Sequence, residues 1–177
     1  MNALLTFIAY ELVWFAAVIG AGRGVVWPGV SAAALFVGWR LTVSAQRSVE
    51  GALLAAALLI GTVLETCWVR GGLIRYAAAW PLASAPAWLL ALWASFGLTI
   101  VPLFGYLHSR PALAAATGAV GGPLSYLAAA HGWHAVLLPA HPWRSLFALA
   151  LGWAAALPAL TTFARRRLAM GTARSLA

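Results

Sequence analysis

The chain has 177 residues, of which 64% are hydrophobic and only 8% are charged, and its mean hydropathy is +0.92. Soluble proteins average about 25% charged residues, so this composition excludes an ordinary soluble protein and predicts one integral membrane domain over residues 1–177. The net charge of +8 is due to arginines alone, because the chain has no lysine. These arginines lie between apolar segments or in one run near the end, so we expect contact with membrane lipids and no nucleic-acid binding.

Six apolar segments follow one another along the chain, separated by arginine, glycine and proline, which favour the headgroup region or end helices. Strict alternation of apolar and polar residues is absent, so helices are predicted rather than a membrane-spanning barrel. The expected fold class is all-α, a polytopic membrane bundle of six transmembrane helices. The segments are 3–21, 25–43, 51–69, 87–107, 112–130 and 145–164.

Arginine counts predict the orientation of this bundle. Six spans place both termini on one side, which carries seven arginines against four on the other side. The positive-inside rule then places both termini in the cytoplasm, as expected for a bacterial inner-membrane protein. The seven are Arg40, Arg47, Arg110, Arg165, Arg166, Arg167 and Arg174, and the four are Arg23, Arg70, Arg75 and Arg144.

The first apolar segment carries Glu11 at its middle and lacks a basic start, so we expect a retained span rather than a secretory signal. A carboxyl group at this depth costs free energy, although the surrounding apolar residues still allow the helix to insert. Carboxyl groups in membrane helices usually face a partner or a pathway. Two interpretations stay open for Glu11: a hydrogen bond between helices, or a role in proton transfer or ligand binding.

Glu65 lies in the third segment, a few residues before the arginines that follow it. It can reach water or pair with Arg70 or Arg75, and such a pair is often only structural. Alternatively, Glu65 points inward beside another helix, where Gly61 one turn earlier would leave room. The sequence does not decide between these interpretations.

The fourth segment places Ser95, Thr99 and Pro102 along one helical face, while its other faces are apolar. That face should look into the bundle, where it meets either a ligand or another helix. Pro102 is a potential hinge, because proline removes a backbone donor.

The fifth segment combines a Gly-x-x-x-Gly pair, Gly118 and Gly122, with Pro123 in the middle of the predicted helix. Small residues at this spacing allow two backbones to approach closely, and the proline predicts a kink or hinge. The alternative is that this broken turn, together with Ser125 and Tyr126, lines a cavity.

Histidines and the single cysteine give little indication of a metal site. His131 and His134 share the spacing of a helical metal pair, but a fixed third ligand is lacking. Cys67 has no partner cysteine in the chain, and the absence of aspartate excludes a Ser/His/Asp set. We therefore expect neither a metal nor a cofactor.

Three stretches carry a family resemblance: 14–18, 91–96 with its Trp-x-x-Phe motif, and Gly-Gly-Pro-Leu-Ser-Tyr at 121–126. They resemble a family of small bacterial inner-membrane proteins that contain a domain of unknown function. The resemblance implies a multi-span fold and, because members are often encoded near enzymes that modify fatty acyl chains, points towards lipid metabolism. Residues 99–102 depart from the polar pattern of that family, which weakens the case for a polar site there.

Three functions remain open, and whether the chain is an enzyme is undecided. The preferred hypothesis is a bundle that binds or modifies a lipid or another apolar molecule near the outer leaflet, which predicts a lateral apolar cavity. The second is a small transporter, or a membrane subunit of one, with Glu11 as an intramembrane carboxylate. The third is a scaffold or assembly factor without a pocket, and a homo-oligomer or larger membrane complex fits any of the three. The residues assigned to a polar site are Glu11, Glu65, Arg70, Ser95, Thr99, Tyr126 and His131.

Overall fold

A computed structural model describes residues 3–175 as a bundle of helices with one pair of short strands, so residues 1–2 and 176–177 of the expected domain lie outside the described residues. The prediction of an all-α helical bundle is confirmed. In chain order the elements are α1 (Ala3–Gly22), α2 (Trp27–Val43), α3 (Arg47–Arg70), β1 (Arg75–Tyr76), α4 (Ala87–Gly97), α5 (Ile100–Leu103), the 3-10 helix η1 (Gly105–Leu107), α6 (Pro111–Trp133), β2 (Val136–Leu137) and α7 (Trp143–Ser175).

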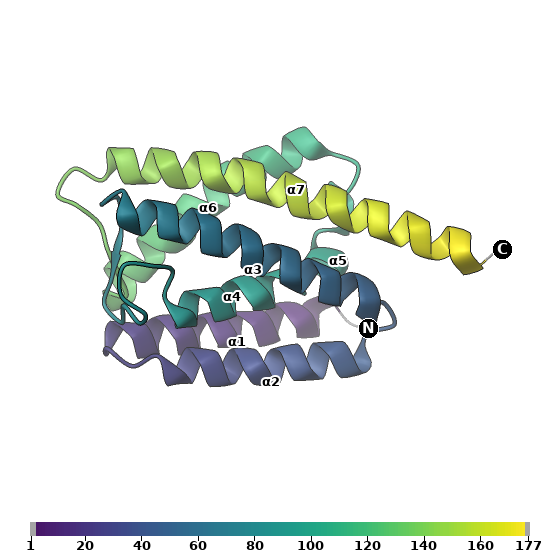
Figure 1. The fold of residues 1–177 in the computed structure, drawn as a ribbon, viewed down its shortest axis with the longest axis horizontal. Helices are drawn as coiled ribbons and strands as arrows, with labels where there is room; N and C mark the ends of the chain where they lie inside the picture. The colour runs from purple at the N-terminus through teal and green to yellow at the C-terminus, as the bar shows by residue number, and fades with distance from the viewer. Residues whose placement is uncertain (1–2, 176–177) are drawn as a thin grey trace.

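The chain runs back and forth along the bundle, and both ends of the chain lie at the same end of it (Figure 1). We call this the terminal end, where α1, α3 and α6 begin. The opposite end holds the connections after α1, α3 and α6. Helix α6 crosses α7 at a clear angle, whereas α1 and α2 lie side by side (Figure 1).

Four helices, α1, α3, α6 and α7, are long and apolar enough to cross a membrane, judged by length and composition. Helix α2 has 17 residues, which is at the lower limit for a span. The fourth predicted segment is a short helix, α4, followed by α5 and η1. The bundle therefore contains all six predicted segments, and four of them are long and apolar enough to qualify as spans.

The prediction of one continuous helix over 87–107 is wrong, because the chain breaks after Gly97. The Leu98 and Thr99 amides donate to carbonyls three residues back instead of four. Thr99 also returns its hydroxyl to the Phe96 carbonyl, 2.7 Å away, and Pro102 has no amide hydrogen to continue the helical ladder. Together these features divide the segment into three pieces.

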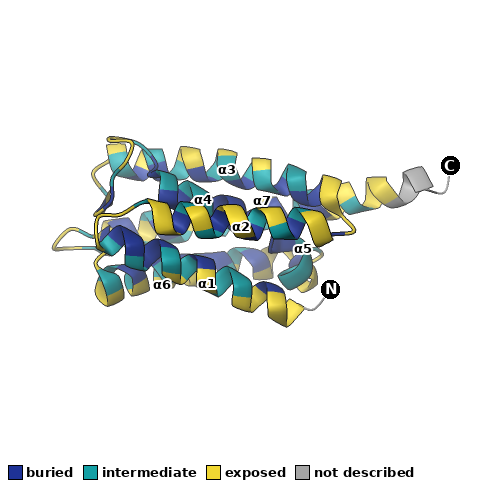
Figure 2. Cartoon of the chain, turned by 90° about the horizontal axis from the view of Figure 1, so that it is seen from below, coloured by how far each residue is buried: buried dark blue, intermediate teal, exposed yellow. Residues whose placement is uncertain are grey.

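Large apolar side chains cover the outside of the bundle. Leu12, Leu35 and Leu59 are 65%, 77% and 67% exposed, whereas water-soluble monomers rarely present such continuous apolar surface. Figure 2 shows the exposed residues along the outer faces of the helices and the buried residues between them. This surface, together with the four long apolar helices, is that of an integral membrane protein.

Two connections at the opposite end are joined by the short antiparallel pair of β1 and β2, in which Tyr76 is opposite Val136. A second link is formed by the Ser145 hydroxyl, which donates to the Leu73 carbonyl at 2.6 Å. The pairing holds the α3–α4 connection against the end of α6. As a result, Tyr76 is a loop residue that is nevertheless buried inside the bundle.

Candidate functional site

Glu65 lies in the last third of α3, faces the bundle interior and is fully buried. Its Oε2 accepts a hydrogen bond from the Tyr76 hydroxyl at 2.5 Å, and its Oε1 accepts one from Trp93 Nε1 at 2.9 Å and another from the Tyr126 hydroxyl. These donors come from β1, α4 and α6. Both carboxyl oxygens are therefore satisfied without a basic partner.

The expected pairing of Glu65 with Arg70 or Arg75 is thereby corrected. Arg70 Nε donates instead to the Ala83 carbonyl at 3.3 Å, and Arg75 is exposed at the opposite end. Within residues 3–175 the ion pair found is a different one, between Arg40 and Glu50. Glu65 meets the phenol and indole donors because its face of α3 turns toward the bundle interior.

Tyr76 stands outside the apolar helices yet is buried, with its ring packed edge-on against Trp88 at 5.7 Å between centroids. Burial, reinforced by the neighbouring Glu65 carboxyl, raises the pKa of the Tyr76 phenol well above its usual range. The phenol therefore keeps its proton and remains a hydrogen-bond donor to Glu65 at neutral pH.

Gly61 makes room for Trp93 beside Glu65. A Cβ added at Gly61 would lie 2.4 Å from Trp93 Cγ, a distance that no packed side chain tolerates. On its other side the Trp93 ring is stacked on Trp153 of α7, with centroids 4.4 Å apart and planes 11° from parallel. The indole that donates to Glu65 is thus held between α3 and α7.

A cavity of about 330 Å³ lies between α1, α4, α6 and α7. Its walls are mostly aromatic and aliphatic, and they include Trp93 and Tyr126, the two helix-borne donors to Glu65. Along α6 the lining runs from Thr117 to Ala129, which corresponds to about 18 Å at 1.5 Å per residue. The space is therefore elongated along the bundle, with Glu65 just behind its wall.

The mouth of the cavity is on the outer surface between α1 and α6. Glu11 of α1 and Thr117 of α6 line the cavity and are only half-buried, and Gly121 lines it and is exposed. Next to them, Leu12 is 65% and Val120 61% exposed. Because these neighbours face the region of the lipid tails, the cavity opens sideways toward the membrane at about the middle of both helices.

At the opposite end, α1 and α6 close together. The Trp133 ring contacts Trp14 and Phe15 edge-on, with centroids 5.4 Å apart in both pairs. A Cβ at Gly22 would lie 1.9 Å from the Trp133 carbonyl oxygen, so the backbones touch there. This contact closes the gap between α1 and α6 at that end.

Gly118 and Gly122 face α7 rather than a second run of small residues. A Cβ at Gly118 would lie 2.2 Å from the Trp153 carbonyl oxygen, and one at Gly122 would lie 2.3 Å from the Trp153 ring. Both glycines also line the cavity. The helix continues through Pro123, and Ser125 donates to the Gly122 carbonyl at 2.9 Å in the same turn.

The other residues predicted for a polar site lie apart from the cavity. Ser95 and Thr99 are buried, but each hydroxyl donates to a carbonyl of its own segment. Pro102 lies in α5 beyond the helix break. His131 is exposed in the last turn of α6, where its Nδ1 lies 3.0 Å from the Leu127 carbonyl. The described residues hold no group of three or more potential metal ligands.

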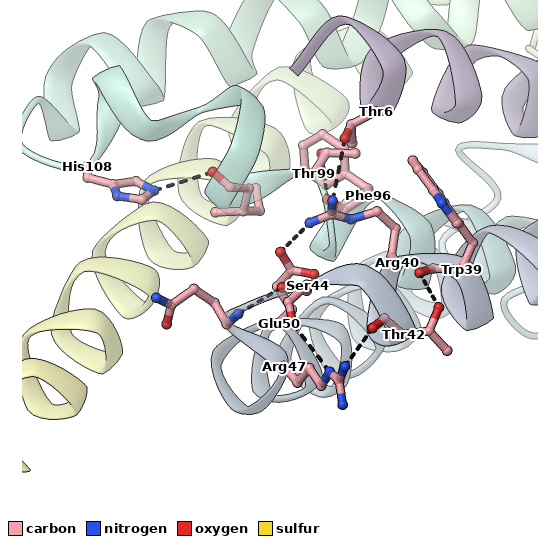
Figure 3. Close-up of polar contacts among 12 residues, drawn as sticks. Thr6, Trp39, Arg40, Thr42, Ser44, Arg47, Glu50, Phe96, Thr99 and His108 are labelled. Carbon is pink, nitrogen blue, oxygen red and sulfur yellow. Dashed lines mark hydrogen bonds and ion pairs between the residues drawn. The ribbon is translucent and has the colours of Figure 1, made fainter. Parts of the chain in front are cut away.

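A buried ion pair at the terminal end was missed in the sequence. Arg40 is 1% exposed and contacts Glu50, which is 2% exposed, and its Nη1 lies 3.5 Å from the Thr6 hydroxyl. Figure 3 shows the guanidinium between Thr6 of α1 and Glu50 of α3. Arg40 thus belongs to α2 rather than to a connection. Without Arg40, the terminal end carries six arginines and the opposite end carries four. The available signal was a pair of opposite charges 10 positions apart where the second predicted segment joins the third.

Sequence reasoning also missed Tyr76, Trp93 and Trp88. An indole in an apolar helix needs an acceptor, because lipid tails offer none, and Glu65 is the acid in the same half of the bundle as Trp93. That argument was available for Trp93. Tyr76 gave no such signal, since it lies in a connection.

Comparison with known families gives one match. The model of a family described as "Protein of unknown function (DUF2878)" matches residues 3–159. No curated protein and no solved structure matches the chain.

Proposed function

The chain belongs to the DUF2878 family, as its sequence resemblance indicated, and we propose that it binds one apolar molecule, taken up sideways from the membrane. The observation that carries the proposal is the elongated cavity whose mouth lies between lipid-facing residues of α1 and α6. A mouth at this position admits molecules dissolved in the bilayer and excludes those in water. With both termini in the cytoplasm of a bacterial inner membrane, the deep part of the cavity belongs to the outer leaflet.

The size of the cavity limits what it holds. Ligand sites in proteins range from about 300 to 1,000 Å³, so 330 Å³ is small. A single hydrocarbon chain or a substituted ring fits such a volume, whereas a complete two-chain phospholipid does not. The length of about 18 Å along α6 favours an extended chain.

The wall around the deep part of the cavity is rigid. Trp93 is fixed by its hydrogen bond to Glu65 and by stacking on Trp153, and Tyr126 is fixed by Glu65. A rigid wall reduces the entropy lost on binding, which raises affinity. Glu65 is therefore proposed as a positioning residue that shapes the cavity, and not as a group that touches the ligand.

A second function, transport, is favoured by the place of Glu11. Its carboxyl group is half-buried at the mouth, about midway along α1, and intramembrane carboxyl groups at such positions often carry protons. A scaffold role fits less well, because it requires no cavity. Glu11→Gln separates the two remaining functions: it abolishes proton-dependent movement of the ligand if Glu11 carries protons, whereas binding of a neutral ligand requires no ionisable group at this position.

Binding is tested with a substitution whose side chain fills the mouth of the cavity. A Cβ at Gly121 meets nothing within 4 Å, so Gly121→Leu adds bulk at the mouth without a backbone clash. Gly132→Leu, on the same helix and equally open but outside the cavity lining, is the matched control. Native mass spectrometry and lipid analysis of the purified proteins should detect a bound apolar species with the wild type and Gly132→Leu, and lose it with Gly121→Leu. Equal occupancy in all three proteins would refute binding at this site.

A further inference from the structure

The deep part of the cavity contains a hydrogen-bond donor without an acceptor. Trp88, in the first turn of α4, lines the cavity and is 1% exposed, and its Nε1 is buried without a hydrogen-bond partner among the described residues. Buried polar groups in proteins are nearly always paired. The Trp88 ring is held edge-on against Tyr76, so the donor is fixed in place.

The neighbouring donors are already used. Trp93 and Tyr126 both donate to Glu65, and the Ser125 hydroxyl donates to the Gly122 carbonyl. Trp153 Nε1 is the other buried donor without a partner among the described residues that line the cavity, but Trp153 lies against Gly118 and Gly122, midway along α6. A ligand that reaches the deep end therefore meets the Trp88 indole N–H as the donor there. Its natural complement is a hydrogen-bond acceptor on the ligand.

The charges around the cavity exclude one class of acceptor. Glu11 lines the mouth, Glu65 lies behind the wall, and no arginine or histidine is present among the described residues that line the space. Placing a phosphate, sulfonate or carboxylate there would remove it from water without a cation to compensate, which is strongly unfavourable. A neutral acceptor has no such cost.

From the donor and the charges together, and resting on the proposed binding function, we propose that the ligand is a neutral carbonyl compound on an apolar chain, such as an ester or ketone. Its carbonyl oxygen accepts the Trp88 N–H at the deep end. Its chain extends along α6 toward Thr117 and the mouth. Lipids with anionic headgroups are excluded from the interior and serve only as the surrounding solvent.

The test compares three probes of similar chain length: methyl decanoate, decane and decanesulfonate. Each is equilibrated with the detergent-solubilised full chain, and occupancy is measured by native mass spectrometry over a range of probe concentrations. We expect methyl decanoate to bind about three- to tenfold more tightly than decane, which corresponds to one net hydrogen bond. Decanesulfonate should bind more weakly than decane.

Three variants assign the binding preferences to residues. Trp88→Phe keeps an aromatic ring and removes the N–H, so it should abolish the advantage of the ester over decane. Trp143→Phe, at a tryptophan that is 63% exposed and away from the cavity, should leave all affinities unchanged. Glu11→Gln should narrow the difference between decane and the sulfonate, because it removes a carboxyl group from the mouth.

The outcomes separate this inference from the binding function. If none of the probes binds the wild type, the binding function itself fails. If decane and the ester bind equally, the cavity takes apolar chains but Trp88 recognises no carbonyl group, and the inference is overturned. Tighter binding of the sulfonate overturns it as well. These comparisons use the wild type, so they test the preference for a carbonyl group even if Trp88→Phe does not fold. An ester preference that persists in folded Trp88→Phe overturns the assignment to Trp88.

Discussion

Glu65 shows how a membrane bundle holds a carboxyl group away from lipid. Three donors from β1, α4 and α6 converge on its two oxygens, so one side chain ties α3 to three other elements. Trp93 and Tyr126 present their hydrogen-bonding edges to Glu65 and also form part of the cavity wall. The polar cluster therefore fixes the shape of an apolar site without entering it.

The buried phenol of Tyr76 predicts a loss of stability at alkaline pH. Its pKa is raised by burial in the folded state, whereas the unfolded chain releases the same proton near pH 10. The folded state thus binds more protons above about pH 10, and its free energy of unfolding falls there by up to about 1.4 kcal/mol per pH unit from this group. Below that pH the contribution is fully present.

Unfolding in detergent, followed from neutral pH to about pH 11, measures this effect. Tyr76→Phe should be less stable at neutral pH, because it loses a hydrogen bond, but its stability should decline less steeply with alkalinity. Tyr106→Phe is the control, since Tyr106 is 57% exposed on η1. Parallel pH profiles for the wild type and Tyr76→Phe would contradict the assignment.

At the level of single residues, the sequence predicted the structure only where the chemistry of a side chain by itself determines its surroundings. Glu65 stands out in the sequence because a carboxyl group in an apolar run must find a partner. Its partners could not be predicted, because Tyr76 reaches it through the pairing of β1 with β2 and Tyr126 lies 61 positions away in the chain. Likewise Ser95 and Thr99 fall on a polar face of the predicted helix, yet the hydroxyl of each donates a hydrogen bond to a nearby backbone carbonyl.

At the scale of elements, Arg40 joins three helices at the terminal end of the bundle. It belongs to α2, pairs with Glu50 of α3 and approaches Thr6 of α1 (Figure 3). Removing one partner of a buried ion pair leaves the other charge uncompensated, which typically costs about 3–5 kcal/mol. Replacing both with apolar residues of similar size removes most of that penalty.

A double-mutant cycle tests this linkage. We expect Arg40→Met and Glu50→Leu each to lower the free energy of unfolding by about 3–5 kcal/mol, and the double variant to be close to the wild type. Unfolding in detergent gives the free energies. Additive losses in the double variant would mean that the two residues act separately and that the pair does not connect α2 with α3.

Hydropathy predicted the elements better than their internal breaks. All six apolar segments contain helices, and the ends of α1 and α2 fall within two residues of the predicted ends, because arginine, glycine and proline mark those boundaries. The break after Gly97 was not predicted, since its causes are hydrogen bonds that side chains form with nearby carbonyls. The cavity could not be predicted from single segments, because it arises from how α1 and α6 meet at one end and separate at the other.

At the scale of the whole molecule, the path of the chain predicts six crossings, although four of the described helices are by themselves long and apolar enough to cross a membrane. Helix α2 is about 25 Å long, slightly less than a hydrocarbon core of about 30 Å, but its neighbour α1 is long enough and runs beside it (Figure 1). Helix α4 is continued by α5 and η1 toward the terminal end. We therefore expect both termini in the cytoplasm, as the six terminal-end arginines favour.

Thiol labelling distinguishes six crossings from four. In a Cys67→Ser background, single cysteines replace three exposed residues: Gln46 and Ser109 at the terminal end, and Leu82 at the opposite end. If the chain crosses the membrane six times, an impermeant maleimide added to spheroplasts labels only Leu82→Cys. If α2 and α4 stay on one face while the other four helices cross, the pattern reverses at two positions: Gln46→Cys reacts outside and Leu82→Cys does not. Because the two patterns differ at both positions, a single unlabelled site cannot mimic the wrong topology.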